Sequence, residues 1–96
     1  MIACNQRELD YSKLQERNEV YYVVNEDKPF NGKAIAYYEN GQIERKGNYE
    51  NGELDGEYIV YYENGQIGVK SNYKNGELHG KFIWYYEKKK IRVKKM

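Results

Sequence analysis

Residues 37–43 read YYENGQI, and the same seven residues return at positions 61–67, 24 positions later. A degraded third copy, YYEKKKI, occupies residues 85–91. The intervening segment NYENGELDG, at residues 48–56, also returns after 24 positions as NYKNGELHG at residues 72–80. Self-similarity at a fixed period is the signature of a tandem-repeat architecture. The sequence therefore predicts a chain built from units of 24 residues.

Each unit contains two Asn-Gly dipeptides between short runs of β-branched and aromatic residues. Asn-Gly is the strongest short-range signal for a two-residue type I′ hairpin turn, because both central residues of that turn need positive φ. The structural glycines expected in these turns are Gly41, Gly52, Gly65 and Gly76. We therefore predict an all-β fold, an antiparallel β-meander of tandem 24-residue β-hairpin repeats.

Two-residue turns at these positions place the apolar side chains on one face of the sheet. They set Tyr62 opposite Ile67, and they set Tyr49 opposite Leu54. A slip of one residue would invert every side chain, so this consistency supports the register. The predicted apolar face carries Ile43, Tyr49, Leu54, Tyr58, Val60, Tyr62, Ile67, Val69, Tyr73, Leu78, Phe82, Trp84, Tyr86, Ile91 and Val93.

The opposite face carries one tyrosine from each unit, namely Tyr37, Tyr61 and Tyr85. Equivalent strands lie two ladder spacings apart, so we expect these rings to form a row at intervals of about 10 Å. Exposed aromatic residues on a rigid sheet are typical of contact surfaces, and same-face aromatic pairs also stabilise sheets. The candidate partner-binding residues are these three tyrosines together with Trp84.

The first 19 residues lie before the repeats, so we divide the chain into an N-terminal segment, 1–19, and a repeat domain, 20–96. Asp10 to Arg17 could form a short helix, with Leu9 and Leu14 against the sheet. The start Met1-Ile2-Ala3-Cys4 resembles the lipobox that ends a bacterial lipoprotein signal, whose hydrophobic segment would lie upstream. Cys4 is then a candidate lipidation site, and an incidental thiol at an ordinary cytosolic start is the alternative.

Charge is unevenly distributed along the chain. Six cationic residues follow Glu87, so the formal net charge of +1 leaves about −5 on residues 1–87. The Lys-rich tail guards an exposed strand edge or contacts an anionic partner or membrane surface. An acidic body lacks the electropositive groove that nucleic acid needs, so we expect no nucleic-acid partner.

The sequence offers no catalytic or metal-binding constellation. One Cys and one His cannot assemble a recognisable protein zinc site, so we expect no metal and no cofactor. His79 occupies the repeat position of Asp55 and Asn31, each directly before Gly, which indicates turn chemistry rather than acid-base chemistry. We therefore predict that the chain is not an enzyme.

The segment 73–80 (YKNGELHG), followed by Phe82, Trp84 and the Tyr85-Tyr86 pair, resembles MORN repeats of the bacterial variant. The resemblance covers about residues 20 to 93. It extends to proteins labelled as antitoxins of toxin-antitoxin systems, of the YwqK type. It implies antiparallel hairpin arrays that act as protein-binding or membrane-associated modules, and it implies no chemistry. The first unit is irregular around Pro29 and the last lacks its Asn-Gly turn, so both are expected to serve as caps.

Two function hypotheses follow. The first is a non-enzymatic module of the bacterial cytoplasm that binds a protein partner, such as a toxin, or a second copy of itself. The alternative is a cell-envelope lipoprotein held at the membrane surface through Cys4 and the Lys-rich tail. Self-association or a partner is expected because the apolar face lies on a single sheet, and the N-terminal segment offers only Leu9, Tyr11 and Leu14 to cover it.

Overall fold

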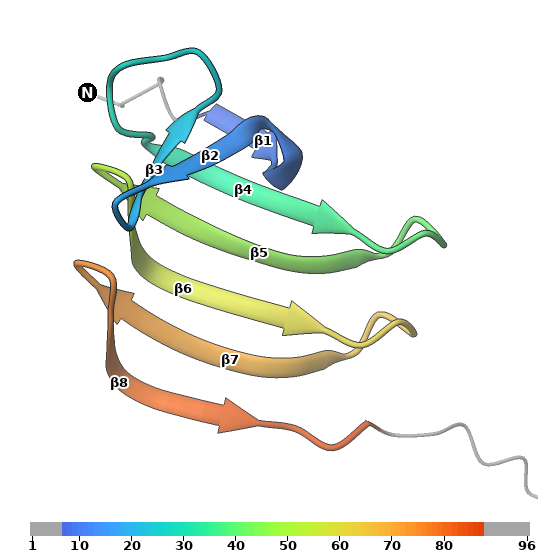
Figure 1. The fold of residues 1–96 in the computed structure, drawn as a ribbon. Coiled ribbons are helices and arrows are strands. Elements are labelled where there is room, and N and C mark those ends of the chain that lie inside the picture. Colours follow the sequence, from blue (N-terminus) through green and yellow to red (C-terminus); the bar gives the residue numbers. More distant parts are fainter. Residues whose placement is uncertain (1–6, 88–96) are drawn as a thin grey trace, which may run out of the picture.

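The computed structural model describes residues 7–87 (Figure 1). Strands dominate this part of the chain, and the one helical element is a single turn of 3-10 helix. The elements in order are β1 (Arg7–Asp10), η1 (Tyr11–Lys13), β2 (Leu14–Arg17), β3 (Val20–Val23), β4 (Gly32–Tyr37), β5 (Ile43–Glu50), β6 (Glu53–Tyr61), β7 (Ile67–Lys74) and β8 (Glu77–Trp84).

Strands β4 to β8 form one antiparallel meander, in which each strand pairs with its neighbour in sequence. β1 extends the same sheet by pairing in parallel with β4. β2 and β3 form a separate antiparallel hairpin, which lies across β4 and β5 near one end of the sheet (Figure 1). The predicted all-β fold of successive hairpins is confirmed.

The Asn-Gly dipeptides form two kinds of turn. At Asn51-Gly52 both residues have positive φ, +52° and +80°, as a type I′ turn requires, and Tyr49 pairs with Leu54 as predicted. At Asn64-Gly65 only the glycine has positive φ, and the Tyr62 N–H donates to the Gln66 carbonyl at 2.8 Å. That loop therefore has three residues, so the predicted type I′ turn is wrong there. Asn75-Gly76 follows the first kind and Asn40-Gly41 follows the second.

The longer loop shifts the register near the turn, and a bulge restores it. Ile67 pairs with Tyr61 instead of the predicted Tyr62, whereas Val60 pairs with Val69 as predicted. Gly68 is the extra residue between these two pairings. Cross-strand partners share a face, so Ile67 lies on the face of Tyr61 and not on the predicted apolar face. The same irregularity places Ile43 opposite Tyr37.

The second tyrosine of each YYENGQ copy joins neighbouring units. The Tyr38 hydroxyl donates to the Tyr61 carbonyl at 2.5 Å, and the Tyr62 hydroxyl donates to the Tyr85 carbonyl at 2.6 Å. At the opposite end of the strands, the Gly52 N–H donates to the Phe30 carbonyl and the Gly76 N–H donates to the Leu54 carbonyl. Each unit is therefore attached to the next by one repeated pattern of hydrogen bonds.

The hydrophobic core lies where the N-terminal residues cover the first unit. Phe30 and Ala34 are fully buried, and Tyr49 is 7% exposed. The partly buried residues that pack against them are Leu9, Tyr11, Leu14, Tyr21, Val23 and Leu54. Leu9 and Leu14 therefore contact the core as expected. The predicted helix from Asp10 to Arg17 is wrong beyond its first turn, because Leu14–Arg17 is strand β2.

The Tyr11 and Tyr49 hydroxyls form a hydrogen bond of 3.0 Å inside this core. Burial raises the pKa of both hydroxyls above the ordinary value, because it disfavours the phenolate. The unfolded chain thus releases these protons near pH 10, while the folded chain retains them. The contribution of the pair to stability is complete below pH 10 and is lost as pH rises above that value.

We therefore expect the free energy of unfolding to fall above pH 10 by up to about 1.4 kcal/mol per pH unit for each of the two tyrosines. Urea unfolding at a series of pH values measures this slope. Tyr49→Phe should make the slope shallower, because it removes one of the two protons. The exposed Tyr37→Phe controls for the other alkaline groups, and a slope that both variants leave equally steep would contradict the assignment.

Candidate functional site

The most exposed large apolar residues lie at the C-terminal end of the sheet. Trp84 is 72% exposed and Tyr86 is 90% exposed, and their rings stack with centroids 6.5 Å apart. Leu78 and Phe82 are each about half exposed. We call Leu78, Phe82, Trp84 and Tyr86 the open apolar patch. Isolated apolar residues on a surface are ordinary, whereas a contiguous group of this kind marks an interaction site.

The open apolar patch continues the face that is buried in the first unit. Cross-strand pairing places Ala34, Gly47, Tyr58, Ser71 and Phe82 in one row from β4 to β8. Residues 11–30 cover the β4 end of this row, and the cover does not reach β8 (Figure 1). The apolar face was expected to need a second molecule to cover it. For the first unit this expectation is wrong, because residues of the same chain cover it. The β8 end remains exposed.

Arg45 lies on the same face, between the covered and the open parts. Its guanidinium carbon is 4.1 Å from the centroid of the Tyr11 ring, which is a cation-π contact. Its Nε atom is buried and has no hydrogen-bond partner among the described residues. Arg45 pairs across the sheet with Ala36 and Val60, so it stands in an otherwise uncharged part of the face.

The predicted row of tyrosines lies on the reverse face. Tyr37 and Tyr85 are exposed and Tyr61 is half-buried, with the Lys46 ammonium 5.9 Å from its ring. Strand alternation places Trp84 on the apolar face and Tyr85 on the reverse face. The four predicted contact residues therefore belong to two different surfaces, and their role in binding stays a prediction.

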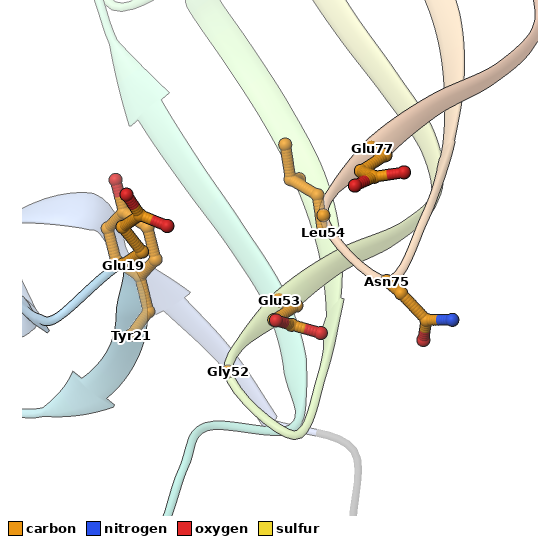
Figure 2. Close-up of a pocket in the computed structure, with 8 residues that line it drawn as sticks. Glu19, Tyr21, Gly52, Glu53, Leu54, Asn75 and Glu77 are labelled. Atoms are coloured by element: carbon orange, nitrogen blue, oxygen red, sulfur yellow. The ribbon is translucent and has the colours of Figure 1, made fainter.

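An acidic hollow of about 390 Å³ lies where the turn between β2 and β3 faces the stacked Asn-Gly turns (Figure 2). The carboxylates of Glu19, Glu53 and Glu77 surround it, and Tyr21 and Leu54 contribute apolar surface. Asn75, Gly52 and Gly76 complete its lining. Its charge suits a cationic group, and it offers no nucleophile or acid-base pair.

The remaining predicted features are Cys4, the Lys-rich tail and His79. Cys4 and the Lys-rich tail lie outside residues 7–87. Within that range, no three His, Cys, Asp or Glu residues are grouped to hold a metal ion. His79 is exposed on β8 and directly precedes Gly80, which has φ of +92°. No helix of residues 7–87 is long and apolar enough to span a membrane.

The fold and this surface define a β-hairpin repeat protein. Residues that precede the repeats cover its first unit, and strand β8 is exposed. The comparison with protein families agrees: the chain matches the MORN repeat variant over residues 30–51, 54–75 and 78–96. These matches cover more than half of the chain, so the protein belongs to the MORN repeat variant family. Curated proteins and solved structures gave no match.

Two of the segments matched by the family model coincide with hairpins of the structure. The match over residues 30–51 contains the β4–β5 hairpin, the match over 54–75 follows the β6–β7 hairpin, and the match over 78–96 begins within β8. MORN repeats occur in binding or membrane-associated modules, which fits a repeat module without catalytic groups. The family thus agrees with the surface in pointing to binding.

Sequence reasoning missed Arg45. Its repeat equivalents are Val69 and Val93, 24 and 48 positions later, so a cation replaces valine in the first unit alone. That departure from the repeat is the signal by which the sequence could have identified it.

Proposed function

We propose that the chain is a non-enzymatic protein-binding module and that the open apolar patch is its contact surface. The exposure of Trp84 and Phe82 on a face that is buried elsewhere in the same sheet carries this proposal. Interface hot spots are enriched in Trp and Tyr, and burial of such rings supplies most of the binding energy. The family supports the binding role in general terms.

The test compares Trp84→Ser with Tyr37→Ser, which replaces an exposed aromatic residue of the reverse face. Each variant is used to capture partners from the native cell and is run in sedimentation equilibrium beside the wild type. Trp84→Ser should weaken association at least about thirtyfold, the equivalent of a hot spot of about 2 kcal/mol, and Tyr37→Ser should leave it unchanged. The opposite result would place the contact surface on the reverse face.

An antitoxin-like role is a narrower form of this proposal, with a toxin as the partner. The resemblance to YwqK-type proteins supports it. Co-expression of the chain with the product of an adjacent gene should then rescue growth, and Trp84→Ser should abolish the rescue. Rescue that survives in this variant would separate antitoxin activity from the open apolar patch.

The alternative function is attachment to the bacterial cell envelope as a lipoprotein. The Met1-Ile2-Ala3-Cys4 start and the six cationic residues after Glu87 support it. Metabolic labelling with a radioactive fatty acid should mark the wild type and not Cys4→Ser, and the label should appear in the membrane fraction. An unlabelled wild-type chain would refute lipid attachment and leave the binding proposal intact.

A further inference from the structure

Among the cross-strand pairs of β4 to β8, Arg45 is the single charged residue on the apolar face. The other paired residues of that face are Gly32, Ala34, Ala36, Gly47, Tyr49, Leu54, Gly56, Tyr58, Val60, Val69, Ser71, Tyr73, Leu78, Phe82 and Trp84. The equivalent residue in the next unit is Val69, so the hairpin repeat itself does not need a cation at this position.

Among the described residues, Arg45 forms no close ion pair with a carboxylate. The ion pairs in residues 7–87 are Arg7 with Glu26 and Lys70 with Glu57. Contact with the Tyr11 ring compensates part of the desolvation of the guanidinium. Burial alone would lower the pKa of Arg45, but a hydrogen bond with the Tyr58 side chain and the nearby Glu44 carboxylate raise it overall. The buried Nε–H has no hydrogen-bond partner among the described residues.

The position of Arg45 relates it directly to the open apolar patch. Cross-strand pairing joins Arg45 to Val60, Val60 to Val69, and Val69 to Trp84. Three strand spacings separate Arg45 from Trp84, which is about 15 Å. An extended peptide rises about 3.3 Å per residue, so a segment of about five residues would reach from one to the other.

We propose that Arg45 binds a carboxylate of the protein partner, whose chain crosses the strands from Arg45 to an apolar side chain seated at Trp84. This inference rests on the proposed function and adds the chemistry of the partner. The guanidinium is a planar fork that matches a carboxylate, and its terminal N–H groups supply the donors. A single cation among apolar residues suits a ligand with one negative charge. A phosphate carries a second charge, which Arg45 alone would leave unpaired.

The experiment pans a phage-displayed library of random peptides against the whole chain and retains the peptides that Trp84→Ser fails to bind. Selected peptides should carry Asp or Glu about five residues from an aromatic or large aliphatic residue. Exchange of that Asp or Glu for Asn or Gln should weaken binding about ten- to a hundredfold, as expected for a charge-assisted hydrogen bond.

Matched variants of the chain separate binding from folding. Arg45→Gln should abolish the preference for the acidic peptide, while Arg45→Lys should keep part of it because the charge remains. In the NMR spectrum of the wild type, the Nε–H signal of Arg45 should shift with the acidic peptide and not with its amide counterpart. This signal reports on the contact itself and does not depend on the stability of either variant.

Two outcomes would overturn the inference and are distinguishable from each other. Peptides that need Trp84 but bind equally well as acid and amide would refute the carboxylate contact and leave the proposed function standing. A library that yields no peptide dependent on Trp84 would refute the open apolar patch as a peptide-binding surface, and the Arg45 contact with it.

Discussion

Tyr49→Ala is expected to lower the free energy of unfolding by about 3 to 5 kcal/mol, a large part of the stability of a small domain. Tyr49 is 7% exposed, and its ring contacts Tyr11, Tyr21 and Phe30 at centroid distances of 5.3 to 6.2 Å. Its hydroxyl also pairs with Tyr11. The truncation therefore removes buried surface, several aromatic contacts and a hydrogen bond together.

The repeat supplies the matched control for this substitution. Tyr73 occupies the same position one unit later, and its one aromatic contact in the described residues is with Tyr58 at 5.9 Å. Tyr73→Ala should therefore lower the free energy of unfolding by only about 1 to 2 kcal/mol. Urea denaturation followed by circular dichroism gives both values. Equal losses would show that the N-terminal cover contributes little to the core.

Gly52→Ala is expected to lower the free energy of unfolding by about 2 to 4 kcal/mol. Gly52 has φ of +80°, where alanine is disfavoured by about 1 kcal/mol or more. A β-carbon at this position would also lie against Val20 Cγ1 and 2.8 Å from the Tyr21 carbonyl oxygen. The backbone of β3 cannot move away without losing its hydrogen bond to Gly52, so overpacking adds to the conformational strain.

Gly76→Ala separates the cost of placing alanine at positive φ from the cost of overpacking against β3. Gly76 has nearly the same φ, +82°, in the same type of turn, but the nearest atom to an added β-carbon is Glu53 Cβ at 3.8 Å. This variant should lose only the conformational term, about 1 kcal/mol. Thermal or urea unfolding of the two variants in parallel measures the difference. A loss at Gly76 as large as that at Gly52 would mean that overpacking against β3 is unimportant.

The repeat, the meander and most of the register could be predicted because they depend on local signals. Alternation along β6 and β7 fixes the face of Val60 and Val69. Asn51 and Gly52 both have the positive φ that a type I′ turn requires. The loop at Asn64 could not be predicted from the dipeptide. There the Asn64 side chain accepts a hydrogen bond from the Gln66 N–H, so asparagine closes a different turn without entering positive φ.

The cover was less predictable because its residues lie outside the repeat. Leu14–Arg17, LQER, has good helix-forming residues and no strand alternation, yet it pairs with β3. Tertiary pairing overrides a weak local preference in such a short segment. The candidate site was predictable only in part. Trp84 was predicted as a contact residue and lies in the open apolar patch, but the extent of this patch depends on where the N-terminal cover ends.

The unequal covering of the apolar face also sets a gradient of local stability along the chain. In repeat arrays each unit contacts only its neighbours, so a strand with a neighbour on one side only receives less support. Strand β8 is exposed throughout and pairs only with β7 among the described residues, whereas β4 lies between two strands and beneath the cover. Amide protons of β8 should exchange fastest, as in the low-stability regions of other proteins. A partner seated on Trp84 would thus complete the least stable unit and slow the opening of the sheet from that end.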